Sequence, residues 1–219
     1  MSKTVFIDPG HGGRDPGAVN GTRFEKDDNL AFAMAVKKKL AAQGISTTMA
    51  RETDIDISLS ARCGMANAQN ADMLVSIHRN MFTSTAANGV EIWVYTNPTA
   101  QETAAAQKMM KELADVGIQS NRGVKRGNYH VLRESKMPAV MIEPGFLSNA
   151  RDNELFDTKL DDYAQAITKG ICGALGIPLT EPAGELFRVQ VGAFKNRDNA
   201  ENFLRTVQAS WPEAFIAKS

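Results

Sequence analysis

Short apolar segments alternate with amphipathic ones along residues 3–175, and this alternation is the strongest constraint on how the chain can fold. Segments typical of strands cover residues 3–7, 45–51, 73–77, 90–95 and 139–142. Segments with helical spacing run from Asp27 or Asp28 to Gln43, and over residues 59–69, 99–116 and 163–175. Strands separated by helices form parallel βαβ units. The pattern therefore predicts an α/β fold, a mostly parallel twisted sheet with helices on both faces.

The pattern is interrupted after residue 176. Two prolines and two glycines between residues 176 and 184 cannot continue a helix or occupy a central strand, so we expect a linker at 177–185. Beyond it, residues 186–191 and 215–217 are typical of strands and residues 196–207 of a helix. We therefore expect a domain at 1–176 and a small C-terminal βαβ module at 186–219. About 35 residues are too few to bury a core alone.

Charge and composition exclude several classes of protein. The 25 basic residues balance the 25 acidic residues, so no net charge attracts the chain to nucleic acid or to an anionic membrane. We find no apolar run of the roughly 18 residues that a membrane helix needs, and the start of the chain is too short for a signal-peptide core. We expect synthesis in the cytoplasm without a signal peptide. Cys63 and Cys172 are expected to be buried thiols.

Polar residues follow three of the predicted strands. His11 comes shortly after the first strand, His78 directly follows residues 73–77, and Glu143 directly follows residues 139–142. The carboxyl ends of parallel strands meet at one edge of a sheet, where ligands gather in open α/β folds. Glu25 lies in a polar segment before a helix, so it can fold over the same edge. We expect these four side chains to converge.

Two histidines and one carboxylate form the ligand set of many catalytic zinc sites, which keep one position open for water. A further carboxylate can then move the proton of that water to a leaving nitrogen. The residue types alone leave other interpretations open. A histidine after a strand is often only a hydrogen-bonded polar residue, and a glutamate there is often salt-bridged at the surface. The glycine-rich loop could cradle a phosphate, although it lacks the lysine of a P-loop. We expect His130 to line a loop.

The exact residues of four motifs narrow these alternatives. They are FIDPGHGG around His11, Glu25 itself, SIHRN around His78 and IEPGFLSN around Glu143. In this order the motifs resemble the type 3 zinc-dependent N-acetylmuramoyl-L-alanine amidases, over about residues 3–175. The resemblance implies a fold related to zinc exopeptidases and one Zn²⁺ held by His11, Glu25 and His78. It also implies that Glu143 is the catalytic acid/base, and that the bond cut joins muramic acid to L-alanine in peptidoglycan.

The C-terminal segment has a resemblance of its own. The sequence FRVQVGAFKNR from Phe187, followed by Asn199-Ala200, is similar to the opening of a sporulation-related (SPOR) repeat, a peptidoglycan-binding module. Such a domain has two βαβ halves, and only one is present here. An unpaired half would expose an apolar helix face, so we expect two chains to pair their halves in a homodimer. Without a signal peptide, the resemblance suggests a phage endolysin or a mother-cell autolysin, which acts on the wall after release.

Two other functions share these features. A zinc peptidase or carboxypeptidase acting on the stem peptides would use the same ligands and fold. A non-catalytic wall-binding protein would need only the C-terminal module. The presence of all four expected site residues argues against an inactive enzyme. Asn80 and Arg62 could position substrate or brace the fold, and for Arg62, inside a predicted helix, bracing is favoured.

Overall fold

The computed structural model describes residues 3–180 and 191–217. The chain divides into two compact units, Met1–Thr180 and Glu181–Ser219, and this division falls inside the expected linker at 177–185.

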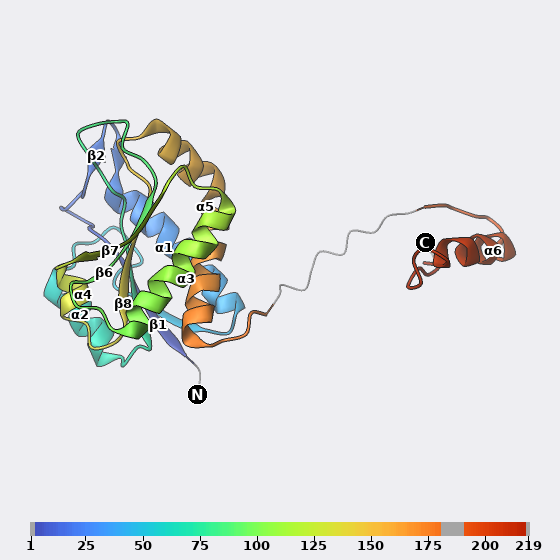
Figure 1. Cartoon of the computed structure of the whole chain (residues 1–219), viewed down its shortest axis with the longest axis horizontal. Helices are drawn as coiled ribbons and strands as arrows, with labels where there is room; N and C mark the ends of the chain where they lie inside the picture. Colours follow the sequence, from blue (N-terminus) through green and yellow to red (C-terminus); the bar gives the residue numbers. More distant parts are fainter. Residues whose placement is uncertain (1–2, 181–190, 218–219) are drawn as a thin grey trace. The chain divides into compact units, whose positions relative to one another are not determined.

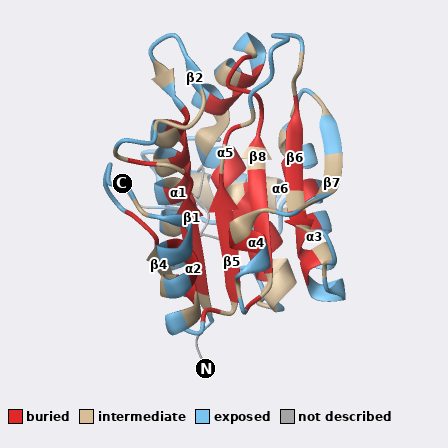
Figure 2. Cartoon of the chain, turned by 90° about the vertical axis from the view of Figure 1, so that its left-hand side faces the viewer, coloured by how far each residue is buried: buried red, intermediate tan, exposed pale blue. Residues whose placement is uncertain are grey.

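The first unit is built on a six-stranded sheet (Figure 1), whose strands follow the order β4-β1-β5-β8-β6-β7 (Figure 2). The strands are β1 (Thr4–Pro9), β4 (Ser46–Met49), β5 (Met73–Ile77), β6 (Val90–Tyr95), β7 (Asn121–Gly127) and β8 (Ala139–Pro144). Neighbouring strands are parallel except β6 and β8, which are antiparallel. A mostly parallel sheet was expected and is confirmed, although the reversal at β6 was not predicted. A small hairpin, β2 (Val19–Asn20) with β3 (Arg23–Phe24), lies apart from the sheet.

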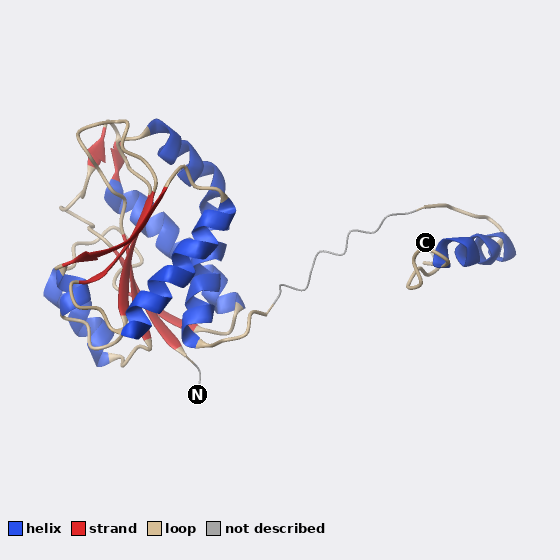
Figure 3. Ribbon diagram, in the orientation of Figure 1, coloured by secondary structure: helices blue, strands red, loops and turns tan. Residues whose placement is uncertain are grey.

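Helices cover both faces of the sheet, as predicted (Figure 3). One face packs against α1 (Glu25–Ala42), α3 (Ala100–Val116) and α5 (Ala150–Leu175), and the other packs against α2 (Leu59–Ala68) and α4 (His130–Arg133). Alternate side chains of β1 show this division, because Val5 and Ile7 join the larger core and Phe6 joins the smaller one. The central strands are accordingly the most buried part of the unit (Figure 2). Among the described residues, no helix has both the length and the apolar content to cross a bilayer.

Three of the longer elements differ from the prediction, and the short elements β2, β3 and α4 were not predicted. Helix α5 begins at Ala150 and not at residue 163, because the Asn149 side chain caps it by accepting from the Asp152 amide at 3.0 Å. The backbone departs from helical geometry at Lys159, so the regular spacing of apolar residues in the second part of α5 does not extend into the first part. Strand β7 was missed because it is an edge strand with polar residues and two glycines. Helix α1 begins at Glu25, earlier than the expected Asp27 or Asp28.

The described part of the second unit contains helix α6 (Arg197–Gln208), close to the expected 196–207. The Asn196 side chain caps it by accepting from two backbone amides. The strand expected at 186–191 lies outside the described residues except for its last residue. The strand expected at 215–217 is wrong, since these residues have no regular structure and pair with no other described segment. The βαβ module is thus represented here by its helix alone.

A buried ion pair braces the loop that leaves β1. Arg62 of α2 and Asp8 of β1 are 3% and 1% exposed, and Nη1 of Arg62 donates to Oδ1 of Asp8 at 2.7 Å. The same guanidinium donates to the backbone carbonyls of Pro9 and His11, at 2.6 and 2.7 Å. The bracing role favoured for Arg62 agrees with these contacts. Cys63, next to it, and Cys172 are buried and free, as predicted.

We expect Arg62→Met to lower the free energy of unfolding by about 3–5 kcal/mol, because it leaves the Asp8 carboxylate buried without its charge partner. Arg151→Met is the matched control, since Arg151 forms an exposed pair with Glu154 whose loss costs less than about 1 kcal/mol. Urea unfolding followed by circular dichroism measures both. Equal stabilities for the two variants would contradict a structural role for the buried pair.

Candidate active site

His11 is held on a strained loop at the carboxyl end of β1. Its backbone has φ 60°, which is uncommon for a residue other than glycine. The preceding Gly10 donates its amide to the Ile77 carbonyl at 2.9 Å, which ties the loop to β5. A Cβ at Gly10 would lie 2.2 Å from Cε1 of His78, so only glycine lets this loop pass so close to the second histidine. The strain at His11 is typical of functional sites.

Glu25 is the first residue of α1, and its carboxylate turns back into the site. The side chain is 5% exposed and accepts hydrogen bonds from the backbone amides of Ala18 and Arg79, at 2.8 and 3.1 Å. The helix has no side-chain cap; instead, the Glu25 amide donates to the Ala18 carbonyl. Because the backbone just before β2 accepts this bond, no side-chain capping residue is visible in the sequence at this position.

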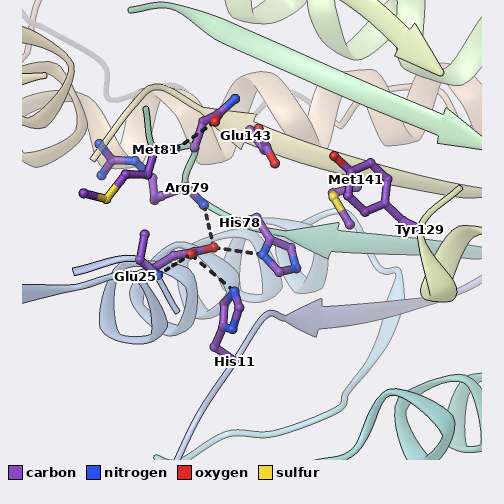
Figure 4. A pocket seen from close by; sticks show the side chains of 10 residues that line it. His11, Glu25, His78, Arg79, Met81, Tyr129, Met141 and Glu143 are labelled. Carbon is purple, nitrogen blue, oxygen red and sulfur yellow. Dashed lines mark hydrogen bonds and ion pairs between the residues drawn. The ribbon is translucent and has the colours of Figure 1, made fainter. Parts of the chain in front are cut away.

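His78 directly follows β5, and its side chain meets Glu25. Nδ1 of His78 lies 2.8 Å from Oε1 of Glu25, and Nε2 of His11 lies 3.3 Å from Oε2 of the same carboxylate (Figure 4). One ligand atom from each of the three residues can be chosen so that all lie within 4.8 Å of one another. The structure therefore brings together the three residues expected to hold a metal.

The surroundings of His11 fit a metal ligand. Nδ1 of His11 lies 2.7 Å from Oδ2 of Asp15, which leaves Nε2 facing Glu25. Metal-binding histidines commonly donate their second ring nitrogen to a carboxylate in this way. Two imidazoles and one carboxylate are also a donor set that suits zinc. Asp15 was not predicted to be a partner of His11. The only feature of the sequence that pointed to it is its position four residues after His11.

The three side chains have strongly coupled charges. Burial raises the pKa of Glu25, but hydrogen bonds with His11 and His78 outweigh it and hold that pKa well below its usual range. Burial lowers the pKa of His11, and Glu25 together with Asp15 more than reverses this, so the net pKa is raised. A cation held between these three side chains would interact favourably with the charge of the Glu25 carboxylate.

Glu143 lies at the carboxyl end of β8, in the same pocket but outside the group of three. Burial is the main reason that its pKa is raised, to about 7, and the nearby carboxylates of Glu91 and Glu25 add to the rise while His78 opposes it. A carboxyl group with a pKa near neutrality can accept and return a proton under ordinary conditions. Its placement is therefore compatible with the expected acid/base role.

The pocket around these residues has a volume of about 360 Å³. It is lined by His11, Ala18, Glu25, His78, Arg79, Asn80, Met81, Tyr129, Met141 and Glu143 (Figure 4). Asn80 therefore belongs to the pocket, where its amide donates to the buried Glu91 at 3.1 Å. His130 was expected to line a loop, but it is the first residue of helix α4, and it is not among the residues that line the pocket. Tyr129 and Glu91 were missed, because Tyr129 precedes a short helix and Glu91 lies in a strand whose direction the sequence does not show.

Comparisons with known proteins agree over most of the chain. The sequence profile of the N-acetylmuramoyl-L-alanine amidase family matches residues 5–174, and the SPOR domain profile matches residues 163–218. The amidase CwlM of Bacillus licheniformis and the sporulation-specific N-acetylmuramoyl-L-alanine amidase of Bacillus subtilis are each 35% identical, over 97% of this chain and 83% of their own.

Solved structures give the same result. A Clostridium difficile N-acetylmuramoyl-L-alanine amidase is 38% identical, with a TM-score of 0.77 over 80% of this chain and 97% of its own. The catalytic domain of CwlV from Paenibacillus polymyxa is 36% identical, with a TM-score of 0.75 over 80% of this chain and 99% of its own. With its fold and four motif residues in one pocket, the chain belongs to the N-acetylmuramoyl-L-alanine amidase family and is a peptidoglycan amidase.

Proposed function

We propose that this amidase depends on zinc, with His11, Glu25 and His78 as the metal ligands and Glu143 as the catalytic acid/base. The observation that carries the proposal is the position of Glu143 in the same pocket as the three potential ligands. A bound zinc ion would supply Lewis acidity, polarising the scissile carbonyl and lowering the pKa of water.

The role of Glu143 follows from its environment. Its carboxylate accepts the proton of the attacking water and then gives that proton to the nitrogen of L-alanine as the amide bond breaks. This second transfer is needed because an amine anion is a very poor leaving group. With a pKa near 7, Glu143 binds the proton strongly enough to take it and weakly enough to return it. Asp15 keeps His11 oriented through the 2.7 Å contact with Nδ1.

The substrate bond is tested by digesting purified peptidoglycan with the zinc-loaded full chain and analysing the products by mass spectrometry. We expect free muramic acid carboxyl groups and peptides that begin with L-alanine. Glu143→Gln should lower the rate of hydrolysis by a factor of about 10²–10⁴ and still bind zinc. His78→Ala should lose both the activity and the bound zinc. Glu134→Gln, at an exposed position, and His130→Ala, at a half-buried position outside the pocket, are matched controls that should retain activity and metal. Cleavage within the stem peptide would instead identify a peptidase.

We propose that the enzyme is made in the cytoplasm and reaches the wall when the producing cell opens, as a mother-cell autolysin in preference to a phage endolysin. The sporulation-specific relative from Bacillus subtilis, aligned over 97% of this chain, supports this choice. Fractionation of the producing cells with a specific antibody should find the protein in the cytoplasm before lysis. Its presence in the wall fraction of intact cells would contradict this route.

For the second unit, we propose pairing between two copies of the chain. Helix α6 has no buried residue, and the apolar side chains around it are exposed. A second copy would cover the exposed apolar side chains on and beside α6. These include Phe203, whose ring centroid lies 5.3 Å from that of Phe194. Sedimentation velocity at micromolar concentration should show a dimer that Phe203→Asp abolishes. Phe82→Asp, at an exposed position of the first unit, is the control, and a monomeric wild type would refute pairing.

A further inference from the structure

On the neighbouring strands β6 and β8, two buried polar atoms beside the site lack hydrogen-bond partners among the described residues. They are Nε1 of Trp93, a donor, and Oε2 of Glu143, an acceptor. Buried polar groups are nearly always paired, so an unpaired donor and an unpaired acceptor in one region need an explanation. The proposed function uses Glu143 but assigns nothing to Trp93.

The register of the sheet makes the two side chains neighbours. In the antiparallel pairing of β6 with β8, Glu91 lies opposite Glu143 and Trp93 lies opposite Met141. Trp93 and Glu143 are therefore diagonal neighbours on one face of the sheet, a separation that an aromatic side chain can bridge. The reversal at β6 is what brings the tryptophan into this position.

The indole ring is held in place from two directions. The Tyr129 ring packs edge-on against it, with 5.3 Å between centroids, and Nζ of Lys125 lies 5.6 Å from its centre. Gly127 makes room for both rings, since a Cβ there would lie 2.5 Å from Tyr129 and 3.1 Å from Trp93. An indole fixed in this way keeps its N–H direction without further support.

We propose that Trp93 is a positioning residue whose indole N–H donates to Oε2 of ionised Glu143, so that Oε1 is the oxygen that takes the proton of water. The inference rests on the acid/base role proposed for Glu143. Hydrogen bonds of catalytic groups are often incompletely formed in an unliganded enzyme and tighten when substrate binds. This explains why both atoms are unpaired in the resting structure.

Electrostatics support the pairing. Burial raises the pKa of Glu143, and the Trp93 N–H acts in the opposite direction by favouring the charged form. The other charged groups that act on this carboxyl are His78, Glu91 and Glu25. Loss of the N–H should therefore raise the pKa of Glu143 further and leave less of the ionised base at a given pH.

The kinetic test compares Trp93→Phe with Trp211→Phe in the zinc-loaded full chain. Trp93→Phe keeps an aromatic ring but removes the N–H, and we expect kcat to fall about tenfold with little change in KM. The acidic limb of the pH profile should move to higher pH, since a larger fraction of Glu143 is then protonated. Trp211 is exposed and lies in the second unit, so its variant should behave as wild type. An unchanged kcat and pH profile for Trp93→Phe would overturn the proposal.

A spectroscopic test does not depend on activity. The chain has two tryptophans, so in Trp211→Phe all indole fluorescence comes from Trp93. Adding Glu143→Gln should change the emission spectrum, because the charged partner of the N–H is replaced by a neutral amide. Identical spectra would overturn the pairing even if Trp93→Phe failed to fold. If the wild type released no amino groups from peptidoglycan, the proposed function would fail while the fluorescence result still decided the pairing.

Discussion

The carboxylate of Glu25 is the contact on which the rest of the site depends. It joins three parts of the chain, since His11 comes from the β1 loop, His78 from the end of β5 and Glu25 itself from the start of α1. Two backbone amides and the side-chain amide of Asn29 also donate to it, so the charge is retained although the side chain is buried. An unpaired carboxylate could not remain ionised there. The fold is arranged to hold a negative charge at one edge of the sheet.

Because β6 runs antiparallel to β8, the edge of the sheet that holds the site also receives the first residues of a strand. Parallel strands deliver only their carboxyl ends to the site, and His11, His78 and Glu143 arrive in this way. Strand β6 enters from the same edge, so its first residues, including Glu91, lie beside Glu143. Glu91 in turn accepts from Asn80 and is neutralised by basic side chains of β7. One antiparallel strand therefore places beside Glu143 groups that a fully parallel sheet would place at the opposite edge.

This topology also explains what could be predicted from the sequence. His11, His78 and Glu143 follow apolar runs, and such a position is visible without a structure. Glu25 depended on the family resemblance, because a glutamate at the start of a helix is common and its partners are distant in sequence. Glu91 and Trp93 were missed because they lie in a strand whose direction the sequence does not show. The first half of α5 and the polar edge strand β7 lacked the regular spacing on which prediction depends.

Glu25 and Glu143 line the same pocket as His11 and His78 but have opposite properties, and this difference supports the roles proposed for them. Contacts with His11 and His78 hold the pKa of Glu25 below its usual range, which keeps it charged and suited to a cation. Burial raises the pKa of Glu143 to about 7, which suits a group that must gain and lose a proton. Exchanging the two roles would require a metal ligand that is protonated near neutrality and a base too weak to take a proton. The environments, and not the residue type, therefore distinguish the two carboxylates, in agreement with the roles proposed for them.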